Sequence, residues 1–330
     1  MADSVILDEG DRRVLHALQL DGRASFTRIA AVLGMPERAV ARRYHRLRAR
    51  MALRVVGVTR PDPRGQEDWF LRVAGKSESI DAVARTLAGR GDTSWIASLA
   101  GDGGLGGILR TPVSARDRGD TLERFRRSAG AVSVAAQRLL VPVAGVGGWP
   151  GRLQSLTAAE REALTPAVRN ANADSVAMGR PRDDDARRLL GLLAVDGRMS
   201  VARLARACGI PESTVRRRIA ELVGGGTLMF EVEVDSRLYG RHLDVICRLD
   251  VHPAALGDVA SALGSHPEVA FATTTTGVTN ILAFLELADG AHLHRYLTER
   301  IGALPGVHRA ETEIVAQWIK RAGPLVALRA

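Results

Sequence analysis

One stretch of the sequence occurs twice, 175 positions apart, and this duplication limits the folds open to the chain more than any other feature. Asp21-Gly22-Arg23 returns as Asp196-Gly197-Arg198, and the register then continues without a gap. The matched positions include Ser25/Ser200, Arg28/Arg203, Ala30/Ala205, Gly34/Gly209, Pro36/Pro211, Glu37/Glu212, Val40/Val215, Arg42/Arg217, Arg43/Arg218 and Leu47/Leu222. Solenoid repeats are much shorter than this spacing. The sequence therefore predicts a duplicated domain rather than a repeat array.

Each copy of the duplicated stretch has the pattern of two short helices joined by a tight turn. In the first copy, apolar residues between Phe26 and Leu33 recur at helical spacing, and Gly34 follows where helices commonly end. Pro36 then opens a second helix, where its missing N–H group is not needed. The second helix has an apolar face of Val40, Tyr44 and Leu47, and its other faces are rich in arginine. This pattern is typical of a DNA-reading helix-turn-helix, and an αα-hairpin with a solvated basic face is the alternative.

The charge of the chain favours a polyanionic partner, because its 330 residues carry a formal net charge of +9. The first sixty residues hold twelve Arg against six acidic residues, whereas 181–235 hold nine of each, so the basic excess lies in the first copy. Two cysteines, Cys208 and Cys247, are too few for a disulfide framework or a cysteine metal site. We find no apolar run long enough for a signal peptide or a membrane span. We therefore expect a soluble, cytoplasmic protein.

The segments around each helix-turn-helix are duplicated as well. An amphipathic helix over 7–20 and its counterpart near 183–193 precede the two copies, and strand-like runs over 53–58 and 228–234 follow them as wing strands or connectors. Residues 69–143 and 243–320 then each read as strand, helix, strand, strand, helix, strand, a βαββαβ order. In the first of these, a helix is expected at 122–125. Between the copies, Thr157-Ala158-Ala159-Glu160 has a capping-box pattern for a short helix that serves as a spacer or packing element.

We predict an α+β protein with two winged helix-turn-helix domains alternating with two ferredoxin-like βαββαβ domains. The expected boundaries are 1–60 and 182–236 for the helix-turn-helix domains, 66–145 and 241–322 for the βαββαβ domains, and 146–181 for the linker.

This order resembles the Lrp/AsnC (feast/famine) family of transcriptional regulators. The matching signature includes Leu7-Asp8, Asp21-Gly22-Arg23, Leu33-Gly34 and, near the C-terminal end, Leu304-Pro305-Gly306-Val307. Ordinary members of that family carry one such unit per chain and pair through the βαββαβ domain, which is of the RAM type. The resemblance implies that this chain is similar to a dimer made covalent, that it binds double-stranded DNA, and that it forms a further homo-oligomer.

The resemblance also implies an effector pocket, commonly for an amino acid, near the turn that joins the two middle strands. That turn usually reads Gly-x-x-Asp in the family; here it is Gly101–Gly104 in the first copy and Gly277–Asn280 in the second, and both have lost the acidic residue. In the second copy the residues expected to bind an effector are Gly277, Thr274, Thr276, Thr279 and Asn280. The alternative interpretation of these residues is the polar edge of a strand beside a turn.

Candidate DNA contacts lie near the start of each second helix, where such helices usually touch bases. Arg38 and Arg42 are expected to reach base edges, and Arg43 and Arg46 to reach phosphates. The corresponding candidates in the second copy are Ser213, Thr214, Arg216 and Arg217. At matched positions the first copy has Arg38, Ala39, Ala41 and His45 and the second has Ser213, Thr214, Arg216 and Ala220, so we expect the two copies to recognise different half-sites.

Other functions find little support in the sequence. Gly101–Gly106 matches the dinucleotide-binding pattern, but a strand-like run ending in Pro112 follows it where that motif needs a helix. His292 and His294 are two apart, which is the wrong spacing for metal ligands on one helix face. We find no catalytic constellation, no metal site and no cofactor motif. An enzyme, or a small-molecule-binding or architectural protein with a degenerate second DNA-binding unit, is kept as the alternative.

Overall fold

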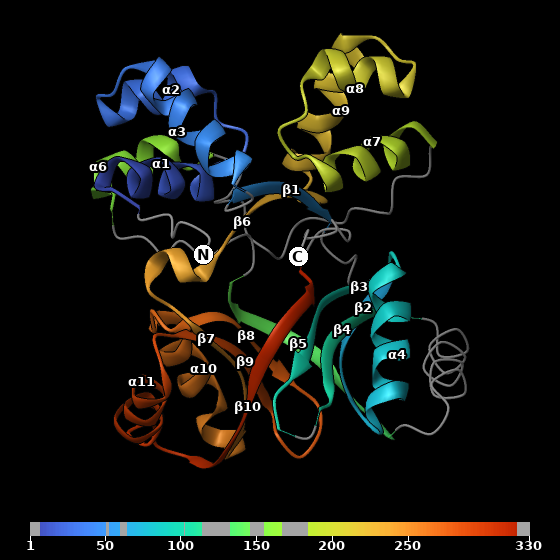
Figure 1. The fold of residues 1–330 in the computed structure, drawn as a ribbon, viewed down its shortest axis with the longest axis vertical. Coiled ribbons are helices and arrows are strands. Elements are labelled where there is room, and N and C mark those ends of the chain that lie inside the picture. Colours follow the sequence, from blue (N-terminus) through green and yellow to red (C-terminus); the bar gives the residue numbers. More distant parts are fainter. Residues whose placement is uncertain are drawn as a thin grey trace. The chain divides into compact units, whose positions relative to one another are not determined.

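The computed structural model describes residues 7–50, 53–59, 65–101, 103–113, 133–145, 155–166 and 184–321. These residues form two units, and each unit takes one segment from each half of the chain (Figure 1). The helix-turn-helix unit comprises Met1–Asp62 and Gly147–Tyr239, and the barrel unit comprises Pro63–Val146 and Gly240–Ala330. The domain boundaries expected from the sequence run consecutively along the chain, whereas the observed units combine matching segments of the two copies.

In the helix-turn-helix unit, the first copy consists of α1 (Glu9–Leu20), α2 (Phe26–Leu33) and α3 (Glu37–Ala49). The Ser25 side chain caps α2 by accepting a hydrogen bond from Arg28 N, and Gly34 ends the helix with a φ of 63°. A left-handed φ of this kind favours glycine, so this residue permits the tight turn into α3. Val40, Tyr44 and Leu47 are buried, as the spacing predicted.

The second copy repeats this geometry with α7 (Asp184–Val195), α8 (Val201–Cys208) and α9 (Glu212–Gly224). Ser200 accepts a hydrogen bond from Arg203 N, and Gly209 ends α8 with a φ of 72°. The same capping residues thus produce the same turn in both copies, and α3 and α9 occupy the position of recognition helices.

The two expected wing strands pair with each other. β1 (Leu53–Thr59) and β6 (Leu228–Val234) form an antiparallel two-stranded sheet in which Leu53 pairs with Val234 and Thr59 pairs with Leu228. The strands therefore do not form a separate wing on each copy. They join the two helix-turn-helix copies into one unit.

The linker helix belongs to this unit. α6 (Ala158–Leu164) begins with the predicted capping box of Thr157 and Glu160, and it packs on α1 and α2. Leu164 is fully buried in the core of the first copy, and Arg13 forms an ion pair with Glu160. Of the two roles expected for this helix, the structure shows packing.

The barrel unit contains the strands and helices that the structure describes in both predicted βαββαβ segments. The first segment supplies β2 (Gln66–Ala74), α4 (Ser77–Gly89), β3 (Thr93–Leu99), β4 (Leu105–Pro112) and β5 (Ser133–Ala144). The second supplies β7 (Leu243–Val251), α10 (Leu256–Ser265), β8 (Val269–Thr275), β9 (Ile281–Leu287), α11 (Gly290–Arg295) and β10 (Val307–Lys320). The helix expected at 122–125 lies outside the described residues.

The two segments do not form separate ferredoxin-like sandwiches. Their strands close into one barrel in the order β10-β3-β4-β2-β5-β8-β9-β7. β5 of the first segment pairs with β8 of the second, and β10 of the second pairs with β3 of the first. A core drawn from both copies includes Phe70, Leu99, Ile246 and Phe284. The last strand of each copy thus completes the sheet of the other, and the chain forms a pseudo-dimer with itself.

In the part of the chain that the structure describes, no helix combines the length and the apolar character needed to cross a lipid bilayer. Cys208 and Cys247 are both buried and not disulfide-bonded. Burial raises the pKa of the Cys247 thiol to about 12, which keeps it protonated.

Candidate functional site

The outward side of α3 carries two exposed arginines, Arg38 and Arg42. They lie four residues apart near the start of the helix, opposite the buried face of Val40, Tyr44 and Leu47. Within the described part of the chain, neither guanidinium group forms an ion pair or a hydrogen bond. Both are therefore placed to interact with an external anion or with base edges.

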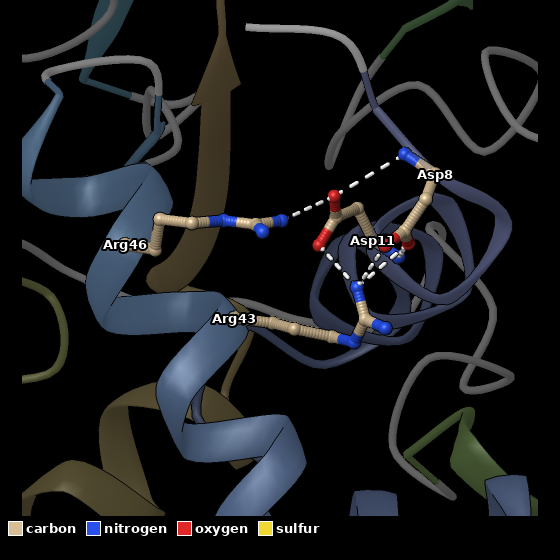
Figure 2. A network of polar contacts seen from close by, with 4 residues as sticks. All are labelled: Asp8, Asp11, Arg43 and Arg46. Atoms are coloured by element: carbon tan, nitrogen blue, oxygen red, sulfur yellow. Dashed lines mark hydrogen bonds and ion pairs between the residues drawn. The ribbon is translucent and has the colours of Figure 1, made fainter.

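Arg43 and Arg46 lie on the side of α3 that faces α1 (Figure 2). Unlike Arg38 and Arg42, they are paired with acidic side chains. Arg43 Nη1 contacts Asp8 Oδ2 at 2.6 Å and Asp11 Oδ1 at 2.8 Å, while Arg46 Nη2 pairs with Asp11 Oδ2. The two aspartates also bind each other's backbone, because Asp8 N donates to Asp11 Oδ2 and Asp11 N donates to Asp8 Oδ1. We call these four residues the Asp–Arg network.

Burial makes this network strong at Asp11, whose side chain is only 1% exposed. A buried carboxylate that loses its cationic partner costs about 3–5 kcal/mol, so Asp11 retains its arginines. The Arg43 guanidinium holds the pKa of Asp8 below its usual value, and its hydrogen bonds to Asp8 and Asp11 raise the pKa of Arg43. Arg43 and Arg46, expected as phosphate ligands, are therefore engaged inside the protein.

A partial signal for this network is present in the sequence. Asp8, Glu9 and Asp11 cap or lie in the first turn of α1, where acidic residues also complement the helix dipole. The second copy has Ala186 where the first has Asp11, and Glu221 where the first has Arg46. A joint difference of this kind at two matched positions indicates that the two side chains interact.

The second recognition helix has a different polar surface. Ser213 is exposed and Thr214 half-buried near its start. Arg216 pairs with Glu212 at 3.2 Å and Arg217 pairs with Glu221 at 2.8 Å, each within α9. Exposed ion pairs of this i,i+4 type contribute only about 0.3–0.5 kcal/mol, so a DNA phosphate can displace the glutamates. α3 carries five arginines and one glutamate, whereas α9 carries three arginines and two glutamates, which makes the first copy the more electropositive.

The residues expected to bind an effector are hydrogen-bonded within the barrel unit. Gln137 of β5 donates from Nε2 to the carbonyl oxygens of Thr276 and Thr279 and to Thr279 Oγ1, at 3.0–3.1 Å. A Cβ atom at Gly277 would lie 2.6 Å from the same nitrogen, so the turn closes directly on Gln137. Sequence reasoning missed this residue because it lies about 140 positions from the turn.

The remaining residues of this turn also have structural bonds. Asn280 accepts from Val251 N and donates to Val251 O, at 3.0 and 2.7 Å. Thr276 Oγ1 accepts from Arg138 N, and Thr274 Oγ1 accepts from Val141 N. These contacts correspond to the alternative interpretation, a polar strand edge. In the first copy, Gly101 and Gly103 have φ values of 92° and 69°, and Asp102 lies outside the described residues.

Among the described residues, no group of three or more His, Cys, Asp or Glu side chains is arranged to hold a metal ion. His292 Nε2 instead lies 3.4 Å from Glu268.

Comparisons with known proteins agree with this geometry. The AsnC-type helix-turn-helix domain matches residues 7–48 and again 183–223, and the Lrp/AsnC ligand binding domain matches residues 244–325. An uncharacterised HTH-type transcriptional regulator of Pyrococcus horikoshii is 31% identical over 140 residues, which are 41% of this chain and 89% of that protein. The HTH-type transcriptional regulator FL11 of the same organism is 26% identical over 141 residues, 42% of this chain and 93% of the regulator.

Among solved structures, the siroheme decarboxylase NirDL has a similar fold, with a TM-score of 0.64 over 95% of this chain and 93% of that one. At 12% sequence identity this likeness concerns the fold alone. The relatives of higher identity are regulators that match about two fifths of the chain, as expected if a single unit has been duplicated. The chain belongs to the Lrp/AsnC family of transcriptional regulators, with the helix-turn-helix domain of that family present twice.

Proposed function

We propose that this protein is a sequence-specific transcriptional regulator that binds double-stranded DNA through α3 and α9. The observation that carries the proposal is the exposed pair Arg38 and Arg42 on α3, which has no partner among the described residues. Arginine pairs with guanine in a bidentate manner, which discriminates against other bases by about 1–3 kcal/mol.

The two recognition helices have different roles in this proposal. α3 supplies base contacts through Arg38 and Arg42 and most of the attraction to phosphate. Arg43 and Arg46 can bind phosphate only when their ion pairs with Asp8 and Asp11 are broken. α9 contributes register and sequence preference through Ser213 and Thr214, with Arg216 and Arg217 exchanging their glutamates for phosphate. Its i,i+4 pairs are exposed, which supports that exchange.

We further propose that a small molecule, such as an amino acid, modulates DNA binding at the turn formed by Gly277–Asn280. A ligand at this turn has to displace Gln137, because that side chain fills the space against Gly277. Binding would therefore break a contact between the first and second segments of the barrel unit.

The proposed function is not enzymatic, and the proposed location is the cytoplasm. Relatives at 26–31% identity are named as regulators, whereas the decarboxylase is similar at 12% identity. A fold can host unrelated functions, so that likeness does not favour a decarboxylase activity here.

Selection of genomic DNA fragments by the full chain, followed by gel shifts over a range of salt concentrations, tests the proposal. A regulator should enrich a defined sequence, and its affinity should fall steeply with salt, because bound arginines release counterions. Enrichment of no sequence, with affinity equal for all duplexes, would favour the architectural alternative.

A further inference from the structure

The two Asp-Gly-Arg turns, which sequence analysis used only to align the copies, lie against each other in the helix-turn-helix unit. Arg198 Nη1 donates to Gly22 O at 2.7 Å and Arg198 Nη2 donates to Ala24 O at 2.9 Å. In return, Arg23 Nη1 donates to Gly197 O at 2.6 Å and to Met199 O at 3.3 Å. Each arginine thus binds the backbone of the matching turn in the other copy, and we call this pair the reciprocal arginine contact.

The reciprocal arginine contact extends to the first recognition helix. The Arg198 guanidinium lies 4.7 Å from the ring centre of Phe26 on α2 and 5.2 Å from that of Tyr44 on α3. Asp196, in the same turn, pairs with Arg48 of α3 at 2.8 Å. The turn that precedes α8 in the second copy therefore contacts the first copy at two points on α3 and one on α2.

The backbone fits closely at this junction. A Cβ atom added at Gly22 would lie 2.8 Å from Phe230 Cβ, and one at Gly197 would lie 3.0 Å from the Val56 carbonyl carbon. Gly197 N also donates to Val55 O at 2.8 Å, beside the β1–β6 sheet. Burial and the charge on Arg198 lower the pKa of Arg23. Two half-buried guanidinium groups are thus held together, and the carbonyl oxygens that receive their hydrogen bonds stabilise this arrangement.

We infer that Arg23 and Arg198 are positioning residues that fix the separation of the two recognition helices and thereby set the spacing of the half-sites that the protein accepts. This inference rests on the proposed DNA-binding function. Two recognition helices joined rigidly bind only half-sites whose separation matches their own, whereas a loose junction accepts several separations. The β1–β6 sheet joins the copies and packs against helices of both, and the reciprocal arginine contact adds directional, charge-assisted hydrogen bonds that restrict how one copy can move against the other.

The experiment uses the full chain and a duplex library in which two half-sites, taken from the fragments that the wild type selects, are separated by a spacer of varied length. A duplex with one half-site is included. The variants are Arg23→Ala/Arg198→Ala and, as the matched control, Arg206→Ala, which removes one exposed positive charge from α8 away from the junction. Arg198→Lys keeps the charge but loses the two-pronged geometry, and it replaces the double variant if that protein does not fold.

The wild type should prefer one spacing, and the ratio of its affinity at that spacing to its affinity half a helical turn away should be large. The double variant should reduce that ratio about tenfold or more, since hydrogen bonds of charged groups are lost, and Arg198→Lys should reduce it in the same direction. Arg206→Ala should leave the ratio unchanged even if it weakens binding at all spacings.

A spacing profile identical in the wild type and the variant would overturn the inference. A wild type that binds a single half-site as tightly as the pair would also overturn it, while the proposed DNA binding would stand. Failure of the wild type to select any sequence would instead contradict the proposed function.

Discussion

At the scale of single residues, the contrast between bound and unbound arginines determines what α3 can offer to DNA. Arg38 and Arg42 are exposed, whereas Arg43 and Arg46 bind Asp8 and the buried Asp11. In the proposed function, internal pairing of this kind would reduce the sequence-independent attraction to phosphate and leave Arg38 and Arg42 available to read bases.

Replacing Asp11 with Asn should release Arg43 and Arg46 for phosphate contacts. The slope of log affinity against log salt for random-sequence duplex DNA should then steepen by about one to two, because each additional phosphate contact adds about 0.9. Fluorescence anisotropy over a salt series measures this slope. Asp185→Asn, at an exposed position of α7 with the same change of charge, should leave it nearly unchanged. An unaltered slope in Asp11→Asn would show that the network does not withhold the arginines.

His16 is a second residue whose environment determines a measurable property. It lies on the buried face of α1 and is 1% exposed. Neither of its ring nitrogens has a hydrogen-bond partner in the described part of the chain. Burial and, to a smaller extent, the charge of nearby Arg161 lower the pKa of His16 to about 4, although Glu160 acts in the opposite direction. The folded protein therefore keeps this histidine neutral.

Because the unfolded chain protonates His16 near pH 6.5, the contribution of this residue to stability is present above that pH and is lost as the pH falls toward 4. The loss is about 1.4 kcal/mol per pH unit, up to about 3 kcal/mol. His16→Leu should remove this dependence, so the difference in unfolding free energy between variant and wild type should grow from pH 7 to pH 5. Urea titrations at both pH values measure it, and parallel pH curves would refute the assignment.

At the scale of elements, α6 makes the first helix-turn-helix differ from the second. α6 packs on α1 and α2, and Leu164 at its end and Leu156 just before its start are both buried in the core of the first copy. At a matched position of the second copy, Val195 is 51% exposed, whereas its counterpart Leu20 is 8% exposed. The linker thus contributes to the hydrophobic core of one copy.

Leu164→Ala should lower the free energy of unfolding by about 2–4 kcal/mol, since it removes a fully buried leucine and leaves a cavity. Val195→Ala, at a half-exposed site, should change it by no more than about 0.5 kcal/mol. Chemical denaturation followed by circular dichroism compares the two. A negligible effect of Leu164→Ala would mean that α6 does not stabilise the first copy.

The ends of individual helices could be predicted from the sequence, whereas the pairing of distant strands could not. Local signals such as Gly34 and Pro36 predicted the helix end, the turn and the next helix, because backbone geometry there depends on neighbouring residues. The pairing of β1 with β6 and of β5 with β8 joins segments more than 120 positions apart, and no local pattern specifies it. The exposed positions of Arg38 and Arg42 follow from helical spacing, which places them opposite the apolar face of the helix. The partners of Arg43 and Gln137 lie far away in the sequence, so they required the structure.

At the scale of the whole molecule, the exchange of β5 and β10 makes each half of the chain incomplete. Residues 1–166 alone would leave β1 without β6, β5 without β8 and β3 without β10. Unpaired strand edges recruit other strands. A half-chain of residues 1–166 should therefore form a homodimer in which a second copy supplies the missing strands. Sedimentation over a concentration range tests this, and a folded monomer at all concentrations would contradict the exchange.

The same pseudo-dimer combines two recognition helices with different side chains in one molecule. A symmetric dimer reads a palindrome, because the symmetry of the protein is matched by that of its operator. At matching positions α3 has Arg38, Ala39 and Ala41 where α9 has Ser213, Thr214 and Arg216, although Arg42 and Arg217 are the same residue type. We therefore expect an operator with two unlike half-sites.

Hydroxyl-radical footprinting on a selected site, with the wild type, Arg42→Ala and Arg217→Ala, tests this expectation most directly. The account predicts an asymmetric footprint in which Arg42→Ala weakens protection of one half-site and relaxes its sequence preference about tenfold or more, as loss of a bidentate contact does. Arg217→Ala should weaken protection of the other half-site. A palindromic footprint that Arg217→Ala does not alter would contradict the account.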